Sequence, residues 1–231
     1  MIPRRPVLSL ALGLLTFVMV QAARPEAALA AQAPTARQAS LETENASADT
    51  RRLAGWVLST GDSQGLPFLI VDKVSARVYA FDHHGLLLGV APALLGAARG
   101  DDLVPGVADR PLSRIAPGER ITPAGRFMAA PGANLAGKNI LWIDYVAAIS
   151  LHPVVPGTPA ERRRQRLASP AADDNRISFG CINVPAAFYE NVVRGLFATS
   201  VGVVYILPET RSLEMVFFTP RATPDQRDSG I

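Results

Sequence analysis

The sequence from Arg176 to Pro185, RISFGCINVP, contains the only cysteine in the 231-residue chain. A glycine directly precedes this Cys181. Pro185 opens an apolar segment typical of a helix start, because proline suits the first turn of a helix. The stretch therefore predicts a sharp turn just upstream of a helix N-terminus. Backbone N–H groups and the helix dipole favour a thiolate in such a place, so we interpret Cys181 as a nucleophile.

Residues 1–30 have the features of a secretory signal peptide. They begin with the basic pair Arg4 and Arg5, continue with an apolar run over residues 7–20, and end in an Ala-x-Ala cleavage site at residues 28–30. The alternative is an uncleaved anchor, but the run is shorter than the roughly 20 residues of a spanning helix. We expect an exported protein of the periplasm or cell envelope, with no stable membrane span after signal cleavage.

Export changes the interpretation of Cys181. Cysteines in oxidising compartments are normally paired, and the chain offers this one no partner. A buried inert thiol and an intermolecular disulfide are the alternatives to a reactive thiol. We prefer reactivity, because it explains why an exported protein keeps a single thiol.

The composition excludes several classes of function. Beyond residue 30 the chain carries 20 basic and 19 acidic side chains, so the overall pI of 9.4 does not indicate a nucleic-acid partner. The sequence contains no phosphate-binding loop and no Cys/His cluster with metal-ligand spacing. We expect no nucleic acid, no metal and no organic cofactor.

The rest of the chain predicts a mainly β fold, a sandwich or barrel, with one or two short helices. We expect a flexible spacer over residues 31–50 that includes the start of a short helix, a catalytic domain over residues 51–219, and a polar C-terminal tail over residues 220–231. Ser47 or Asp49 can cap the first helix, and Leu53, Trp56 and Val57 form its apolar face. A second helix should cover residues 185–197. Residues 91–119 read as a long surface connection. The expected strands are residues 68–71, 77–81, 86–90, 125–128, 139–145, 146–152, 201–207 and 213–218.

A thiol nucleophile needs a base, and histidine is its usual partner. His83 and His84 lie in a predicted hairpin turn, where exposed polar residues are the norm. His152 instead ends an apolar run, from which it can reach a loop that returns with Cys181. A hydrogen-bonded core histidine is the alternative. The unpaired thiol leads us to predict a His152–Cys181 dyad.

The segment that begins at His152 and continues with Ser178-Phe179-Gly180-Cys181-Ile182-Asn183 resembles the signature of the YkuD-type L,D-transpeptidase catalytic domain. Two further pieces agree, in the same order along the chain. TPAGRF at residues 122–127 resembles the Thr-Pro-x-Gly-x-Phe segment of that family, and Asp72-Lys73 with residues 78–81 resembles its first hairpin. The resemblance extends over residues 68–207.

This resemblance implies a mostly β catalytic domain over residues 51–219 that acts on the stem peptides of peptidoglycan. Cys181 would attack the carbonyl of the third stem residue and expel the terminal D-alanine, with His152 as the general base. Backbone N–H groups around Gly180 and Cys181 would bind the oxyanion, and Ser178 would shape the turn. The acyl group would pass to an amine of a second stem or of an envelope protein, or to water.

Three departures from the family pattern concern substrate choice. Phe179 stands where many members have histidine, Asn183 where arginine is usual, and Pro153 where glycine is frequent. Asparagine lacks the charged fork that arginine offers a carboxylate, and Arg176 could supply that charge instead. The candidate substrate-binding residues are therefore Arg176, Asn183 and Phe179. L,D-carboxypeptidase activity, hydrolytic release of envelope proteins from peptidoglycan, and a non-catalytic cell-wall-binding module remain as alternatives.

Two other features allow two interpretations each. The basic run over residues 161–166, ERRRQR, is either a rim that attracts substrate carboxylates or a solvated loop face. Trp142 and Tyr145 either line a substrate groove or pack within a hairpin, and we favour packing.

Overall fold

The computed structural model describes residues 41–42 and 44–218. The predicted signal peptide, residues 31–40 of the spacer, and the C-terminal tail lie outside the described residues. Within the described residues, none of the helices has both the length and the hydropathy needed to cross a bilayer.

In the part of the chain that the structure describes, ten strands form one large sheet and one small sheet, which confirms the predicted mainly β fold. The large sheet has eight strands in the order β3-β2-β1-β10-β5-β6-β7-β9, and the small sheet pairs β4 with β8 in parallel. The strands are β1 (Phe68–Asp72), β2 (Arg77–Phe81), β3 (Leu87–Pro92), β4 (Leu95–Gly96), β5 (Gly125–Ala133), β6 (Asn139–Asp144), β7 (Ile149–Pro153), β8 (Arg176–Ser178), β9 (Ile182–Val184) and β10 (Gly202–Ile206).

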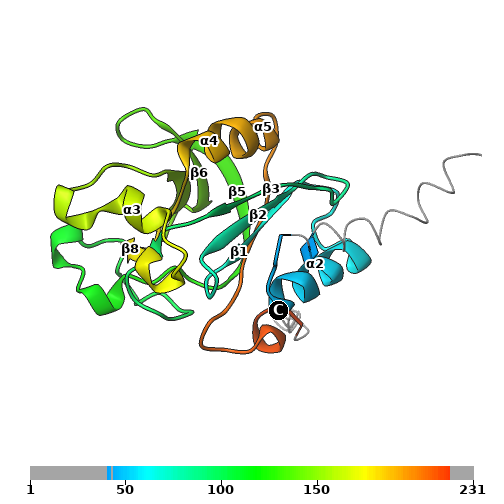
Figure 1. Cartoon of the computed structure of the whole chain (residues 1–231), viewed down its shortest axis with the longest axis horizontal. Helices are drawn as coiled ribbons and strands as arrows, with labels where there is room; N and C mark the ends of the chain where they lie inside the picture. Colours follow the sequence, from blue (N-terminus) through cyan, green and yellow to red (C-terminus); the bar gives the residue numbers. More distant parts are fainter. Residues whose placement is uncertain (1–40, 43, 219–231) are drawn as a thin grey trace, which may run out of the picture. The chain divides into compact units, whose positions relative to one another are not determined.

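The strands in the middle of the large sheet are buried on both faces. Along β1, Leu69 and Val71 join one hydrophobic cluster, whereas Phe68 and Ile70 join another. Side chains alternate between the faces of a strand, so a continuous apolar run such as FLIV indicates cover on both sides. Helix α2 (Ala48–Thr60) contributes to one cluster, and the helical segment that begins with α4 (Ala186–Phe188) contributes to the other (Figure 1).

Helix α2 (Ala48–Thr60) begins at its N-cap Ser47, one of the two predicted caps, and has the predicted apolar face. The Ser47 hydroxyl accepts a hydrogen bond from the Thr50 amide at 3.0 Å, and Gly61 ends the helix with a left-handed φ of 68°. Leu53 and Val57 are fully buried against the sheet. Both end signals are local in sequence, so the helix could be predicted from them.

The helical segment after Cys181 is also present, with one irregular turn. It consists of α4 (Ala186–Phe188), a π-helical turn η5 (Tyr189–Val193) and α5 (Arg194–Leu196). Tyr189, Val193 and Phe197 are buried on the sheet.

Two strand predictions require correction. Residues 213–218 do not form a strand, because Glu214–Phe218 is a π-helical turn, η6. Leu213 and Phe217 are spaced for a helix, and Phe218 packs 5.3 Å from the Trp56 ring. The strand predicted over residues 146–152 begins only at Ile149, because a tight turn with Ala148 at a φ of 55° precedes it.

The predicted surface connection over residues 91–119 is partly internal. Its first residues complete β3 and form β4, and Ala93, Leu94 and Leu95 are fully buried. The remainder includes two 3₁₀ turns, η1 (Leu112–Arg114) and η2 (Pro117–Glu119). The glycine and proline content of this segment correctly indicates turns, but it gives no sign of the short buried strand β4.

A buried ion cluster joins three distant segments. The Lys73 ammonium donates to the Asp101 carboxylate at 2.8 Å and lies 3.6 Å from Glu209, and the three side chains are fully buried. Asp101 also accepts the backbone N–H groups of Glu209, Thr210 and Arg211. The cluster therefore ties the segment after β10 to the turn between β1 and β2.

Candidate active site

Parallel pairing of β7 with β9 brings the two predicted catalytic residues together. Leu151 lies opposite Ile182 and His152 opposite Asn183 in this register. Cys181 directly precedes β9, and the bend at residues 179–180 follows β8. The short strand β9 separates the thiol from the helix start predicted at Pro185, which caps α4 (Ala186–Phe188). Because β9 lies between Cys181 and α4, the helix dipole is not assigned a part in stabilising the Cys181 thiolate, and this prediction is corrected.

Hydrogen bonds hold the turn before Cys181 from both sides. The Ser178 hydroxyl donates to the Cys181 carbonyl at 2.6 Å and accepts the Gly180 N–H at 3.0 Å. The Thr122 hydroxyl donates to the Gly180 carbonyl at 2.8 Å and accepts the Gly96 N–H at 2.8 Å. Thr122 had no role in our sequence interpretation, although it opens the TPAGRF segment.

Gly180 is required by its backbone conformation and by its surroundings. Its φ is 130°, which side chains of L-residues rarely tolerate. A Cβ at this position would lie 2.7 Å from the Ile121 carbonyl oxygen. The turn can therefore pass this close to residue 121 only with glycine.

The surroundings of Cys181 favour its thiolate. Its Sγ lies 3.5 Å from the Ser150 hydroxyl and 3.5 Å from the Ala148 carbonyl oxygen. Burial raises the pKa of the thiol, but hydrogen bonds from His152 and Ser150 outweigh it, so the Cys181 pKa lies below the ordinary value for cysteine. Ser150 is a site residue that the sequence did not reveal.

His152 is shifted in the opposite direction. Burial lowers its pKa, but hydrogen bonds to Cys181 and to the Pro153 carbonyl outweigh this effect, so the pKa lies above the ordinary value for histidine. Its Nδ1 lies 2.8 Å from the Pro153 carbonyl oxygen. A thiol of lowered pKa beside an imidazole of raised pKa can transfer a proton and act as a nucleophile with its base.

Asn183 is fully engaged inside the protein. Its amide nitrogen lies 3.3 Å from His152 Nε2, and its amide oxygen accepts a hydrogen bond from Arg163 Nη1 at 3.1 Å. The residue is 1% exposed. Arg163, from the basic run, therefore reaches the histidine through one amide.

A cavity of about 240 Å³ opens onto Cys181. Phe179, Arg163 and Arg110 contribute to its wall, together with apolar side chains from the connection after β4. The Arg120 guanidinium lies 4.0 Å over the Phe179 ring. The predicted site residues that line this cavity are Cys181, His152, Ser178, Phe179 and Asn183.

Arg176 lies elsewhere, and its predicted role in substrate binding is corrected. Its Nη1 donates to Glu209 at 3.1 Å, its Nη2 donates to the Lys73 carbonyl at 2.8 Å, and its side chain is only 8% exposed. It does not line the cavity at Cys181. Arg176 already has an internal carboxylate and extends the buried ion cluster. Its partner Glu209 is 33 residues away in sequence, which no local pattern indicates.

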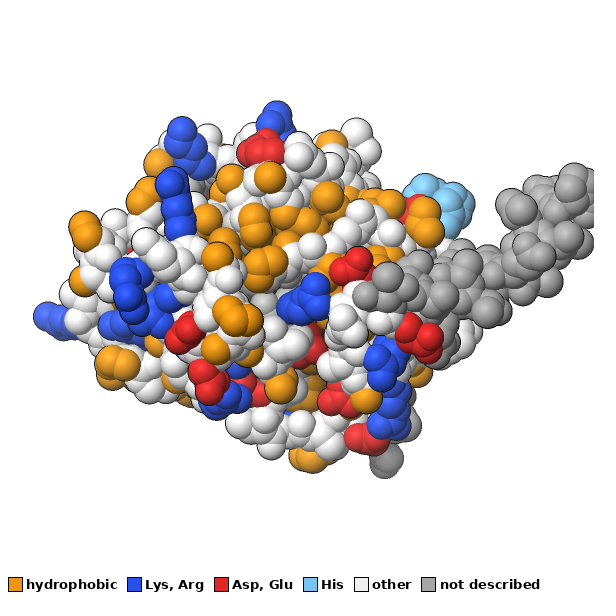
Figure 2. Space-filling model, in the orientation of Figure 1, with side chains coloured by type: hydrophobic (Ala, Val, Ile, Leu, Met, Phe, Trp, Pro, Cys, Tyr) orange, Lys and Arg blue, Asp and Glu red, His pale blue; other side chains and the backbone are white. Residues whose placement is uncertain are grey.

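The basic run divides between the solvent and the interior. Arg162 and Arg164 are exposed, whereas Arg163 is only 9% exposed, and Arg166 donates to the Glu161 and Asp174 carbonyls. Basic side chains gather on the left of the face shown in Figure 2, where α3 (Arg163–Leu167) and β8 lie in Figure 1.

The other residues considered from the sequence lie outside this cavity. His83 and His84 are exposed in a hairpin turn, with ring centroids 3.8 Å apart. Trp142 and Tyr145 pack edge to face at 5.0 Å, as expected for hairpin packing. Within residues 41–42 and 44–218, no group of three or more His, Cys, Asp or Glu side chains is placed to hold a metal ion.

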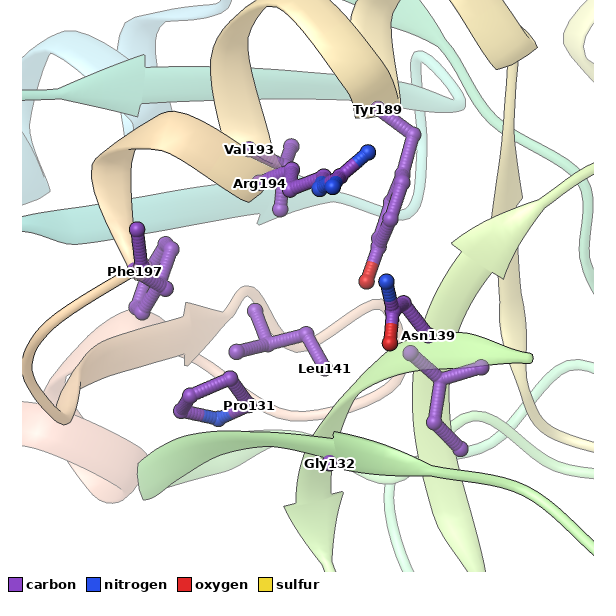
Figure 3. Close-up of a pocket in the computed structure, with 10 residues that line it drawn as sticks. Pro131, Gly132, Asn139, Leu141, Tyr189, Val193, Arg194 and Phe197 are labelled. Carbon is purple, nitrogen blue, oxygen red and sulfur yellow. The ribbon is translucent and has the colours of Figure 1, made fainter. Parts of the chain in front are cut away.

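A larger cavity of about 440 Å³ lies between the β5–β6 hairpin and the helical segment from α4 to α5. Figure 3 shows the Tyr189 hydroxyl directed toward Asn139 across it. Burial raises the pKa of Tyr189 to about 12, so the phenol stays protonated. No thiol, imidazole or carboxylate lines this cavity, and the reactive groups belong to the smaller one.

No family model matches the sequence, and no curated protein matches it. Solved structures similar to the chain include an L,D-transpeptidase of Enterococcus faecium, with 16% identity over 61% of this chain and 49% of that chain, and a TM-score of 0.33. L,D-transpeptidase 1 of Mycobacterium tuberculosis has 15% identity over 61% of this chain and 60% of that chain, and a TM-score of 0.30.

The helical cell shape determining protein Pgp2 of Campylobacter jejuni has 14% identity over 63% of this chain, with a TM-score of 0.39. The chain spans 48% to 60% of the length of these three structures.

Proposed function

We propose that the protein is an exported cysteine acyltransferase of the L,D-transpeptidase type that acts on the stem peptides of peptidoglycan. The observation that carries this proposal is the pair of Cys181 and His152 in one cavity, with pKa shifts in opposite directions. The motif residues Ser178, Gly180 and Thr122 all act on the turn that presents the thiol, which supports the resemblance seen in the sequence.

The first chemical step is formation of a thioester. His152 Nε2 takes the proton of the Cys181 thiol, because its Nδ1 is bound to the Pro153 carbonyl. The thiolate attacks the carbonyl carbon of the third stem residue, and the C–S bond forms. The C–N bond to the terminal D-alanine then breaks, and the imidazolium returns the proton to the leaving amine.

The second step releases the acyl group. An amine of a second stem, or of an envelope protein, attacks the thioester and gives its proton to His152 while Cys181 leaves as the thiolate. The Gly180 N–H already donates to Ser178, so the oxyanion role in both steps falls to the Cys181 N–H. One such donor contributes about 3–4 kcal/mol in other acyl-transfer enzymes.

The walls of the cavity combine apolar surface with a few charged groups. Two guanidiniums, Arg110 and Arg163, line it, and each is paired with a glutamate of its own loop. Leu103, Leu112 and Ile115 supply an apolar wall for the stem. This mixture of apolar surface and a few charged groups is typical of small-ligand sites.

The test is mass spectrometry of tetrapeptide muropeptides incubated with the mature protein. We expect dimers joined between two third-position residues, their loss in Cys181→Ala and His152→Gln, and their retention in His84→Gln, which alters an exposed imidazole. Tripeptides without dimers would replace transpeptidation by L,D-carboxypeptidase activity. Unchanged muropeptides would sink the enzyme proposal and favour a non-catalytic cell-wall-binding module.

A further inference from the structure

Arg163 is the one arginine of the basic run that turns into the cavity at Cys181. Its neighbours Arg162 and Arg164 are exposed, whereas Arg163 is 9% exposed. Its Nε donates to the Glu161 carboxylate at 3.0 Å, and its Nη1 donates to the Asn183 amide oxygen at 3.1 Å. This guanidinium is held from two sides, so its position is well defined.

The contact with Arg163 decides which way the Asn183 amide faces. A guanidinium has only donors, so the amide must present its oxygen to Arg163. The amide NH₂ group is then left facing His152 Nε2, 3.3 Å away. A donor at this position requires Nε2 to be unprotonated, so the proton of neutral His152 lies on Nδ1, which donates to the Pro153 carbonyl.

Protonation of Nε2 would place two donors face to face. The imidazolium therefore loses the Asn183 contact as long as Arg163 holds the amide in place. The positive charge of Arg163 acts in the same sense and lowers the His152 pKa, against the larger effects of Cys181 and the Pro153 carbonyl. The charged groups that face His152 are thus Cys181 and Arg163, with Glu161 behind the arginine and Arg110 across the cavity.

We propose that Arg163 is a positioning residue that acts on His152 through Asn183. It keeps neutral His152 as the Nδ1–H tautomer, with Nε2 unprotonated, and it disfavours the imidazolium. The histidine then returns its proton readily to the leaving amine. The consequence for catalysis rests on the proposed function, but the effect on the imidazole does not.

The test is NMR of the full mature chain labelled with ¹⁵N in its histidine rings, recorded as a function of pH. The chain has three histidines, and His152→Gln identifies the signals of His152. In the wild type, at a pH above the His152 midpoint, we expect protonated Nδ1 and bare Nε2. In Arg163→Met the Asn183 amide can rotate, so the fraction of neutral His152 that carries its proton on Nε2 should rise. The positive charge near His152 is also lost, so the midpoint of the His152 titration should move up by roughly half a pH unit or more.

Two further variants and a control sharpen the test. Arg163→Lys keeps the charge and a donor, so it should remain close to the wild type. Asn183→Asp keeps the shape of the side chain and places a carboxylate between Arg163 and His152. The negative charge favours the imidazolium, so the midpoint of the His152 titration should rise by roughly one to two pH units. Arg164→Met removes an exposed arginine next in sequence and should change nothing.

Unchanged signals for His152 in both Arg163→Met and Asn183→Asp would overturn the proposal and leave Arg163 as loop packing. The far-ultraviolet circular dichroism spectrum reports whether each variant is folded. If the wild type fails to convert muropeptides but the His152 signals respond as expected, then the proposed function fails and the role of Arg163 stands.

Discussion

Cys181 and His152 titrate as a coupled pair, and their contact lowers the pKa of one while it raises the pKa of the other. The thiolate therefore forms at a lower pH than that of an ordinary cysteine, and the imidazolium persists to a higher pH than that of an ordinary histidine. Both shifts favour the thiolate–imidazolium pair over the neutral thiol and imidazole. The thiolate is the reactive form of Cys181.

The rate of alkylation of Cys181 by iodoacetamide should show this shift. Because its pKa is lowered, the rate should rise at a lower pH than for a free cysteine and fall as the pH drops below the pKa of the site. In His152→Gln the stabilising contact is lost and the burial effect remains, so the midpoint should move up. His84→Gln is the control. An ordinary midpoint in the wild type would contradict the activated thiol.

Gly180→Ala should damage both the turn and the thiol. The substitution requires an unfavourable φ and places a Cβ against the Ile121 carbonyl, and such strain costs about 1–3 kcal/mol. Urea unfolding and the alkylation rate measure the two effects. Gly195→Ala is the control, because nothing lies within 4 Å of the added carbon there. Wild-type behaviour of Gly180→Ala would disprove the need for glycine.

At this scale the sequence revealed the residues that form a local motif. Cys181, Ser178 and Gly180 lie within four positions, and His152 stands at the end of its apolar run. Arg163 and Thr122 received no catalytic role because their contacts, to Asn183 and Gly180, span 20 and 58 positions. The residue types of the basic run over residues 161–166 do not indicate which of its arginines is buried.

Among the elements, helix α2 is bounded by two local signals, the Ser47 cap and Gly61. Such signals are readable because both partners lie within one helical turn. The turn η6 was predicted as a strand because its aromatic and β-branched residues favour strands, whereas packing against Trp56 decides the outcome. Tertiary contacts overrode local preference there.

Ser47→Ala should destabilise the protein by about 1 kcal/mol, because the Thr50 amide loses its partner at the helix N-terminus. Urea unfolding followed by far-ultraviolet circular dichroism measures the change. Ser59→Ala, at an exposed position in the last turn, should stay within about 0.5 kcal/mol of the wild type. Equal effects of the two variants would argue against the cap.

For the whole molecule, the buried cluster around Lys73 is the main electrostatic link between distant segments. The Asp101 carboxylate accepts hydrogen bonds from the Lys73 ammonium and from three backbone N–H groups. Burial alone would raise its pKa, but these hydrogen bonds hold the Asp101 pKa well below its usual range. The pairing of a lysine with a carboxylate 28 residues away could not be foreseen from the sequence.

Asp101→Asn should cost about 3–5 kcal/mol, because it leaves the fully buried Lys73 ammonium without its closest carboxylate. The pH dependence follows from the lowered pKa. The stabilisation by Asp101 is present above the unfolded value of 3.8 and is lost as the pH falls from there toward the folded value. Unfolding measured from pH 7 to pH 2 should therefore show less acid sensitivity in this variant than in the wild type.

Asp109→Asn, an exposed aspartate in the same connection, serves as the matched control and should follow the wild type. A wild-type stability for Asp101→Asn at neutral pH would show that Glu209 alone balances Lys73. The predicted cost would then be wrong.

The order of the large sheet has a consequence for the rate at which the chain folds. β10 is the last strand in sequence, yet it lies between β1 and β5, with Val203 opposite Phe68 and Met128. The β3-β2-β1 hairpins and the β5-β6-β7 hairpins can each form from local contacts, but their hydrogen-bonded pairing within one sheet requires residues 202–206. Contacts of such high sequence separation slow folding, because a long loop must close first. A growing chain therefore cannot complete this sheet until β10 has been synthesised, and the edges of β1 and β5 stay open to chaperones until that strand is inserted.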